Sequence, residues 1–139
     1  MTWRLLGGDA VGAASGLAFD EAMMVPYGKG CEPESQASLR FYTYRSHCAL
    51  VGRYQSLHDE VDLGYCRDHG IGVCRRPTGG GAILMGRDQL GVALAAKAPD
   101  GMAPKEVLRM WARGVRAGLS RLGISTSFRS KNDLEVGGR

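Results

Sequence analysis

The sequence lacks several features that would assign it to a particular class of protein. Only 7% of its 139 residues are aromatic, and the longest uncharged apolar stretch runs from Leu90 to Ala96. A helix needs about 20 apolar residues to cross a bilayer, so we expect no membrane span and no membrane partner. Residues 1–9 also lack a continuous apolar export signal, and the default expectation is a cytoplasmic protein.

Metal-binding and disulfide patterns are missing as well. The four cysteines, Cys31, Cys48, Cys66 and Cys74, show no C-x-x-C spacing, which argues against a zinc knuckle. Without an export signal we expect reduced thiols that pack as small apolar side chains.

Length, charge and glycine content set the remaining limits. The length fits a single domain over residues 1–139. The net charge of +4 permits an anionic ligand, an acidic protein or weak contact with nucleic acid. Glycine is abundant, with 21 residues, and its dispersed distribution excludes collagen and repeat folds. We expect tight turns and a backbone that approaches a ligand closely.

Hydrophobic periodicity predicts alternating strands and helices. Val25 ends the first helix before Pro26, and Gly123 is a suitable cap for the long helix that starts at Pro104. We expect helices over residues 12–25, 61–69 and 104–122, and strands over residues 2–6, 39–44, 48–52, 71–75, 82–85, 89–97, 124–128 and 134–136.

The last predicted strand is followed by a strong hairpin signal, Gly137-Gly138. Only Arg139 follows it, so a second strand is missing from the predicted hairpin. We expect either that the natural polypeptide continues or that another chain supplies the strand; the alternative is a frayed tail.

The main candidate site is the stretch from Arg75 to Ala82, which reads R-R-P-T-G-G-G-A. Consecutive glycines allow backbone amides to surround an anion, and arginine presents a planar fork of donors to a carboxylate or phosphate. The stretch lies between two predicted strands. No lysine follows Gly81 as a P-loop requires, and no helix follows as a dinucleotide fingerprint requires. The other interpretation is a wide bend with surface arginines.

A second candidate is Lys131-Asn132-Asp133, which follows a predicted strand. The Asp133 carboxylate could hold Mg²⁺, and Asn132 offers a donor and an acceptor. These residue types also favour turns for purely local reasons.

Together these segments resemble the catalytic domain of lipoate–protein ligases, within the biotin/lipoate ligase superfamily. Gly52-Arg53-Tyr54-Gln55 is similar to the family's G-R-x-Q motif, Arg75–Ala82 to its R-R-x-[ST]-G-G-G-A signature, and Asn132-Asp133 to its N-D pair. The three motifs occur in the family's order with similar spacing.

The resemblance implies an α/β fold of the α+β type, with helices packed around a mainly antiparallel sheet. It implies that lipoate and MgATP form lipoyl-adenylate, and that the acyl group passes to a lysine of an acceptor. The implied acceptor is a lipoyl domain of a 2-oxoacid dehydrogenase or the glycine-cleavage H protein. The residues that would bind substrate and ATP are Arg76, Thr78, Gly79, Gly80, Gly81, Ala82, Ile83, Leu84, Asn132 and Asp133, with Asp133 on the metal.

The chain departs from the family pattern at two places that bear on function. The family's lysine, which polarises the acyl carbonyl, is expected at or just past Arg139, so we assign no catalytic residue and expect the domain to be C-terminally incomplete. Met85-Gly86 stands where many members carry His-Asp.

Three other functions stay open. One is octanoyl or lipoyl transfer without ATP, which in some transferases uses a cysteine nucleophile; Cys74 is the nearest cysteine to the signature. Another is a non-catalytic subunit that binds an acyl-adenylate and needs a partner chain. The third is nucleic-acid binding, which is supported only by the net charge and by the arginines of the long helix. We expect no nucleic-acid partner.

Overall fold

The computed structural model describes residues 2–34, 36–129 and 133–138. Contacts divide the chain into two compact units, Met1–Lys97 and Ala98–Arg139. The expectation of a single domain over residues 1–139 stays a prediction, and each unit is described by itself. None of the helices in the described residues is both long enough and apolar enough to cross a membrane.

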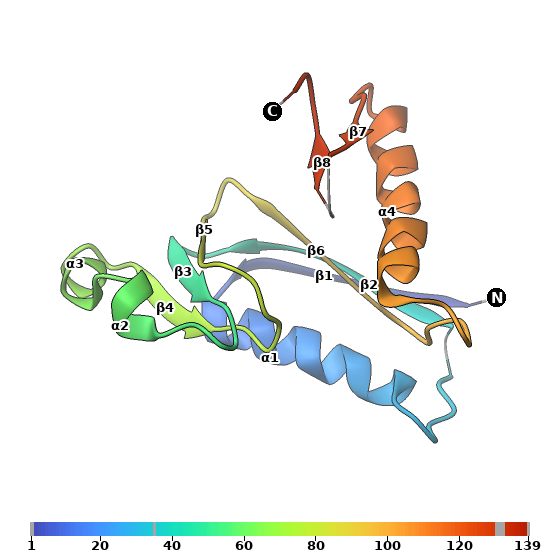
Figure 1. Cartoon of the computed structure of the whole chain (residues 1–139), viewed down its shortest axis with the longest axis horizontal. Helices are drawn as coiled ribbons and strands as arrows, with labels where there is room; N and C mark the ends of the chain where they lie inside the picture. Colours follow the sequence, from blue (N-terminus) through green and yellow to red (C-terminus); the bar gives the residue numbers. More distant parts are fainter. Residues whose placement is uncertain (1, 35, 130–132, 139) are drawn as a thin grey trace. The chain divides into compact units, whose positions relative to one another are not determined.

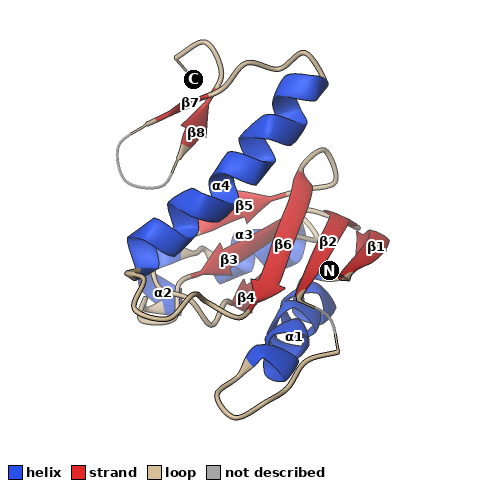
Figure 2. Ribbon diagram, turned by 90° about the vertical axis from the view of Figure 1, so that its right-hand side faces the viewer, coloured by secondary structure: helices blue, strands red, loops and turns tan. Residues whose placement is uncertain are grey.

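The first unit contains two three-stranded sheets and most of the helices (Figures 1 and 2). One sheet has the order β1-β2-β6 and the other β4-β3-β5. The strands are β1 (Trp3–Val11), β2 (Ala37–Tyr44), β3 (Cys48–Val51), β4 (Gly72–Arg75), β5 (Ile83–Met85) and β6 (Leu90–Ala96). The helices are α1 (Ala13–Met24), η1 (Val25–Tyr27), α2 (Leu57–Glu60) and α3 (Leu63–Asp68).

Each of these sheets mixes the two kinds of pairing. β1 and β2 are parallel and β2 and β6 antiparallel; β3 and β4 are parallel and β3 and β5 antiparallel. The expected α/β class with packed helices is confirmed. With the hairpin of the second unit included, antiparallel pairs outnumber parallel ones.

The core of the first unit lies where the two sheets and α1 meet. Tyr42 and Tyr44 of β2 pack with Cys48 and Leu50 of β3, and all four are buried. The rings of Tyr42 and Tyr44 meet edge to face with centroids 5.5 Å apart. The two sheets are therefore joined by side chains that alternate toward the interior along β2 and β3.

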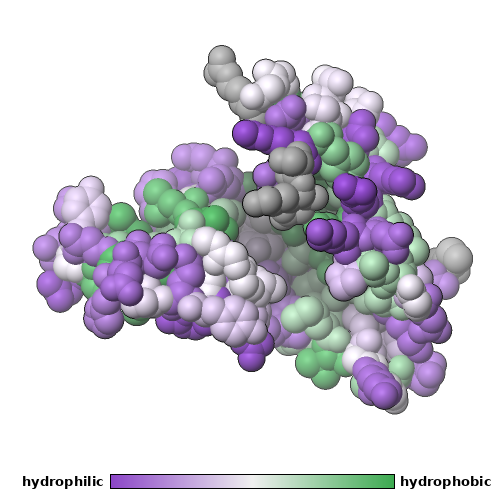
Figure 3. All heavy atoms as spheres, in the orientation of Figure 1, coloured by the Kyte–Doolittle hydropathy of each residue, from purple (hydrophilic) through white to green (hydrophobic). Residues whose placement is uncertain are grey.

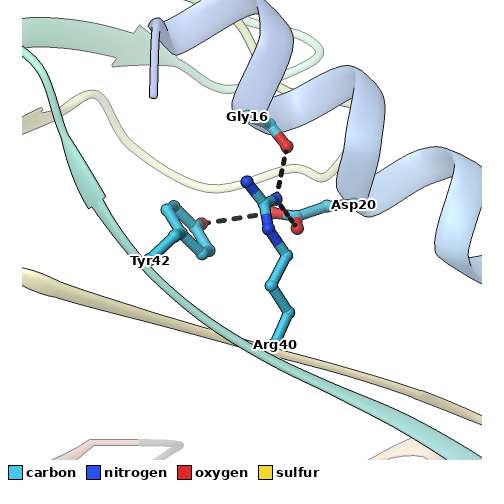
Figure 4. A network of polar contacts seen from close by, with 4 residues as sticks. All are labelled: Gly16, Asp20, Arg40 and Tyr42. Atoms are coloured by element: carbon cyan, nitrogen blue, oxygen red, sulfur yellow. Dashed lines mark hydrogen bonds and ion pairs between the residues drawn. The ribbon is translucent and has the colours of Figure 1, made fainter. Parts of the chain in front are cut away.

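A buried cation fixes α1 on the first sheet (Figure 4). The Arg40 guanidinium, on β2, donates to the Gly16 carbonyl at 3.0 Å and to the Asp20 carboxylate at 2.6 Å, both on α1. The Tyr42 hydroxyl donates to the same carboxylate at 3.1 Å. Arg40 is only 3% exposed, so this pairing is needed to offset the cost of burying its charge.

The segment between β3 and β4 differs from the single helix predicted over residues 61–69. It forms two short helices, α2 and α3, because Val61 has an extended backbone with φ −139°. The Asp62 carboxylate then accepts a hydrogen bond from the Tyr65 amide at 2.9 Å and caps the second helix. The sequence prediction missed this cap because it placed the first turn at Asp59 and Glu60.

The second unit consists of α4 (Pro104–Arg121) and a hairpin of β7 (Ser127–Phe128) and β8 (Leu134–Glu135). The expected glycine cap is confirmed. Gly123 has φ +81°, and the amides of Gly123 and Ile124 bond the carbonyls of Ser120 and Leu119. β8 pairs with β7, while Gly137 and Gly138 both have positive φ, as the predicted turn requires.

Candidate functional site

The parallel pairing of β3 and β4 brings two sequence motifs together. Val51, the last residue of β3, is in register with Arg75, the last residue of β4. The G-R-x-Q turn, residues 52–55, and the glycine loop, residues 76–82, therefore leave the same edge of the sheet. The Arg76 amide donates to the Val51 carbonyl at 3.0 Å, and the Arg53 amide donates to the Thr78 carbonyl at 2.9 Å.

Arg75 holds the first of these loops. One guanidinium nitrogen, Nη1, donates to the carbonyls of Gly52, Arg53 and Gln55 at 2.9, 3.2 and 2.7 Å. The Gln55 side-chain oxygen accepts from the Gly52 amide at 2.7 Å. The turn is thus closed from within and tied to β4 by a charged donor.

Arg76 holds the second loop. Its Nη1 donates to the Leu50 carbonyl at 2.9 Å, and its Nη2 donates to the carbonyls of Gly79 and Gly81 at 3.1 and 2.6 Å. The sequence predicted that this guanidinium would face a ligand. In the structure, much of its donor capacity organises the backbone of the glycine loop.

The grip of Arg76 determines which way the loop amides point. A peptide carbonyl and the amide that follows it point in opposite directions. Because the carbonyls of Gly79 and Gly81 face Arg76, the amides of Gly80 and Ala82 point away from it. None of the described residues accepts a hydrogen bond from the amides of Gly80, Gly81 or Ala82. These donors are arranged to receive an anionic or carbonyl oxygen.

Gly52 and Gly80 are in close contact. A Cβ atom built on Gly52 would lie 2.0 Å from the Gly80 carbonyl oxygen, so any side chain there would displace the glycine loop. Gly80 itself has φ +100°, which favours glycine. Ile83 and Leu84 follow the loop on β5 and are half exposed, and an apolar area lies over β5 in the surface view (Figure 3).

Two of the cysteines, Cys48 on β3 and Cys74 on β4, belong to this sheet and contribute to the core. Cys48 is buried, and burial together with the nearby Cys74 raises the pKa of its thiol, so it disfavours the nucleophilic thiolate. Cys74 packs against the core cluster. These positions give no support to Cys74 as the nucleophile of a transferase.

The remaining candidates belong to the second unit. Asp133 is exposed and its carbonyl accepts from the Arg129 amide at 3.0 Å. Lys131 and Asn132 lie outside the described residues. Within residues 2–34, 36–129 and 133–138, no group of three or more His, Cys, Asp or Glu side chains is placed to hold a metal ion.

Comparison with known proteins identifies the family of the chain. The sequence model of the lipoyl protein ligase A/B catalytic domain matches residues 13–139. The chain belongs to this family. The resemblance drawn from three sequence motifs is therefore confirmed.

Curated relatives within the family include enzymes named octanoyltransferase LipM. The one from Symbiobacterium thermophilum is 36% identical over 129 residues, which is 91% of this chain and 45% of the relative. The one from Clostridioides difficile is 33% identical over 127 residues, which is 89% of this chain and 45% of the relative. The chain spans about half the length of the curated relatives it matches.

Solved structures of lipoate ligases share the fold. A structure from a study of a bi-partite lipoate protein ligase and its E2 lipoyl domain, from Thermoplasma acidophilum, aligns with a TM-score of 0.84 and 30% identity. The alignment covers 99% of this chain and 52% of that one. A lipoate-protein ligase A bound with ATP aligns with a TM-score of 0.80 and 30% identity, over 96% of this chain and 52% of that one.

One departure from the family pattern has a structural counterpart. Where many lipoate ligases carry His-Asp, this chain has Met85-Gly86, and the His47 ring lies against Gly86. A Cβ on Gly86 would lie 2.4 Å from His47 Nδ1, so the ring occupies the space that a side chain would need. His47 is exposed in the structure. The pairing of Cys48 with Met85 explains its place beside Gly86.

Proposed function

We propose that this protein takes part in moving an octanoyl or lipoyl group onto a lysine of a lipoyl domain, with the glycine loop holding the carbonyl end of the acyl group. The observation that carries the proposal is the loop held by Arg76, whose amides at Gly80 and Ala82 point outward. Family membership supports the acyl chemistry.

The loop suits acyl transfer for an electrostatic reason. When a lysine amine attacks an acyl carbonyl, negative charge develops on the carbonyl oxygen, and fixed amide donors stabilise that charge. In transfer from a thioester, the carbon–sulfur bond breaks, an amide bond forms, and the thiol leaves with the proton that the amine loses. The amides need no reorganisation because Arg76 already fixes the peptide planes.

The names of the relatives favour octanoyl transfer as the first candidate for the reaction. ATP-dependent ligation of lipoate is the second, supported by a neighbour whose structure was solved with ATP bound. Outward amides fit a phosphate as well as a carbonyl oxygen. Mg²⁺ is often held by one or two carboxylates plus substrate phosphates, and Asp133, with Asn132, is the proposed contribution of this chain. When bound, ATP and the metal would activate the carboxylate as an adenylate.

We further propose a lipoyl domain of a 2-oxoacid dehydrogenase, or the glycine-cleavage H protein, as the acceptor. The Thermoplasma acidophilum study pairs a lipoate protein ligase with an E2 lipoyl domain, which supports an acceptor of this kind. The proposal also includes a second polypeptide or a further C-terminal segment. Either would supply the family's lysine that polarises the acyl carbonyl, which is distinct from the acceptor lysine.

A two-arm transfer assay tests the reaction. The chain is incubated with an apo lipoyl domain and either octanoyl-pantetheine without ATP, or lipoate with ATP and Mg²⁺, and the domain is analysed by mass spectrometry. Octanoylation in the first arm supports the first candidate, and lipoylation in the second supports the second. Failure of both arms, together with no heat of binding for either acyl probe, overturns the proposal. Binding without transfer overturns transfer by this chain alone, in favour of an acyl-binding subunit that needs a partner chain or a further segment.

Arg76→Lys tests the role of the loop. Lysine keeps the charge but has no planar fork to bridge three carbonyls, so the amides should lose their direction. We expect binding of octanoyl-pantetheine to weaken at least about tenfold, since hydrogen bonds to a charged group contribute roughly 1.5–3 kcal/mol each. Arg67→Lys, at a side chain that is 79% exposed, is the matched control. Equal affinity of both variants would contradict the proposed role.

A further inference from the structure

Tyr54 is the most exposed of the large apolar side chains described, with 84% of its surface accessible to solvent. It lies in the G-R-x-Q turn between β3 and α2. An exposed tyrosine ring does not gain the stabilisation that burial of its apolar atoms would bring. Its exposure beside the candidate site therefore suggests that the ring contacts a ligand.

The exposure of Tyr54 does not come from a loosely held turn. The residues on both sides of it are tied down, since Arg75 bonds the Arg53 and Gln55 carbonyls. The Arg53 amide bonds the Thr78 carbonyl of the glycine loop. The backbone therefore presents this ring to solvent from a fixed position.

The ring borders the glycine loop. A Cβ atom on Gly79 would lie 3.8 and 3.9 Å from Tyr54 Cδ2 and Cε2, so the ring stands beside the space that a side chain at Gly79 would fill. The Arg53 guanidinium stands over the ring, 5.7 Å from its centroid. An apolar plane thus adjoins the loop whose amides point outward.

We propose that Tyr54 is a specificity-determining residue whose ring forms a side wall for the methylene chain of the bound acyl group. This inference rests on the proposed function and names the part of the substrate that the ring contacts. A flexible chain can lie along an edge of the ring beside Gly79, and exposed Ile83 and Leu84 continue the apolar surface after the loop. Arg53 stands over one face of this ring, and AMP tests whether a purine stacks on the other.

Calorimetry with a series of acyl chains tests the inference. Wild type, Tyr54→Ser, Tyr54→Leu and Tyr54→Phe are titrated with butanoyl-, hexanoyl- and octanoyl-pantetheine and with AMP. Each methylene removed from water contributes roughly a factor of four in affinity, so Tyr54→Ser should lose about tenfold for octanoyl-pantetheine and little for the butanoyl probe. Leucine and phenylalanine should restore most of the loss, and AMP binding should not change.

Control measurements separate this inference from the function on which it rests. Tyr65→Ser, at an exposed tyrosine of α3, should bind all probes as wild type does, and melting curves check that each variant folds. If wild type binds octanoyl-pantetheine and Tyr54→Ser binds it equally well, the side wall is overturned while the function stands. Loss of AMP binding that phenylalanine but not leucine restores would overturn it in favour of base stacking. If wild type binds no acyl probe, both fail.

Discussion

Substituting Gly52 by alanine should break the contact between the two loops of the site. The new Cβ would meet the Gly80 carbonyl oxygen at 2.0 Å, and the oxygen must move by about 1 Å to reach the 3.0 Å at which real contacts begin. Its neighbours in the loop are held by Arg76 at Gly79 and Gly81, so the movement strains or breaks those hydrogen bonds. Forced overpacking of this kind costs about 1–3 kcal/mol.

Thermal melting and ligand titration of the same variant test this reasoning together. A loss of 1 kcal/mol lowers the Tm of a domain of 60–100 residues by roughly 4–8 °C, and the first unit has this size. Gly72→Ala is the matched control, because its Cβ would stand 3.5 Å from the Cys48 side chain, an ordinary contact in the same sheet. We expect the control to melt within a few degrees of wild type. If Gly52→Ala has the same Tm as the control and binds octanoyl-pantetheine as wild type does, the close contact between Gly52 and Gly80 does not hold the glycine loop in place.

Other substitutions test the fold that supports the site. Arg40→Met leaves the Asp20 carboxylate without its ion pair and should cost about 3 kcal/mol in urea unfolding; a loss below about 0.5 kcal/mol would contradict the buried network. Gly91→Ala places a Cβ 2.4 Å from the Tyr42 ring and should lower the Tm, whereas an unchanged Tm would show that the ring can move. Burial raises the pKa of Tyr42 above its ordinary 10.0, so its contribution to stability is present below pH 10 and is lost as the pH rises through the folded-state value. Tyr42→Phe should therefore flatten the fall of the urea midpoint as the pH rises above about 10, and an unchanged slope would refute the assignment. Gly114→Ala, with open space around it on α4, should raise the stability of the helix by up to about 1 kcal/mol, measured by circular dichroism.

The order of strands and helices was largely predictable because the hydrophobic periodicity agrees with the positions of the prolines and glycines that begin or end these elements. Pro104 and Gly123 mark the two ends of the long helix, and the structure places both as expected. The glycine loop was correctly placed between two strands. The separation of α2 from α3 was missed because it depends on only two extended residues, Val61 and Asp62.

The internal geometry of the site was less predictable. Sequence reasoning assigned the arginines to a ligand because residue type alone reveals a donor but not its acceptor. Whether Arg76 meets a phosphate or a carbonyl of its own loop depends on the parallel pairing of β3 and β4, a contact between distant segments. Gly52 gave no signal beyond its motif, because its partner Gly80 lies 28 positions along the chain.

Arg75 and Arg76 stand side by side at the end of one strand, yet each holds a different loop. The bonds of Arg75, and the bond from Arg76 to Leu50, join residues that are 20 to 26 positions apart. The other Arg76 bonds lie within its own loop. Because Arg76 also bonds the Leu50 carbonyl of β3, the pairing of β3 and β4 helps to fix the guanidinium that directs the loop amides, and local opening of this sheet should release them. A bound acyl group would therefore slow hydrogen exchange of the β3 and β4 amides as well as that of the loop amides.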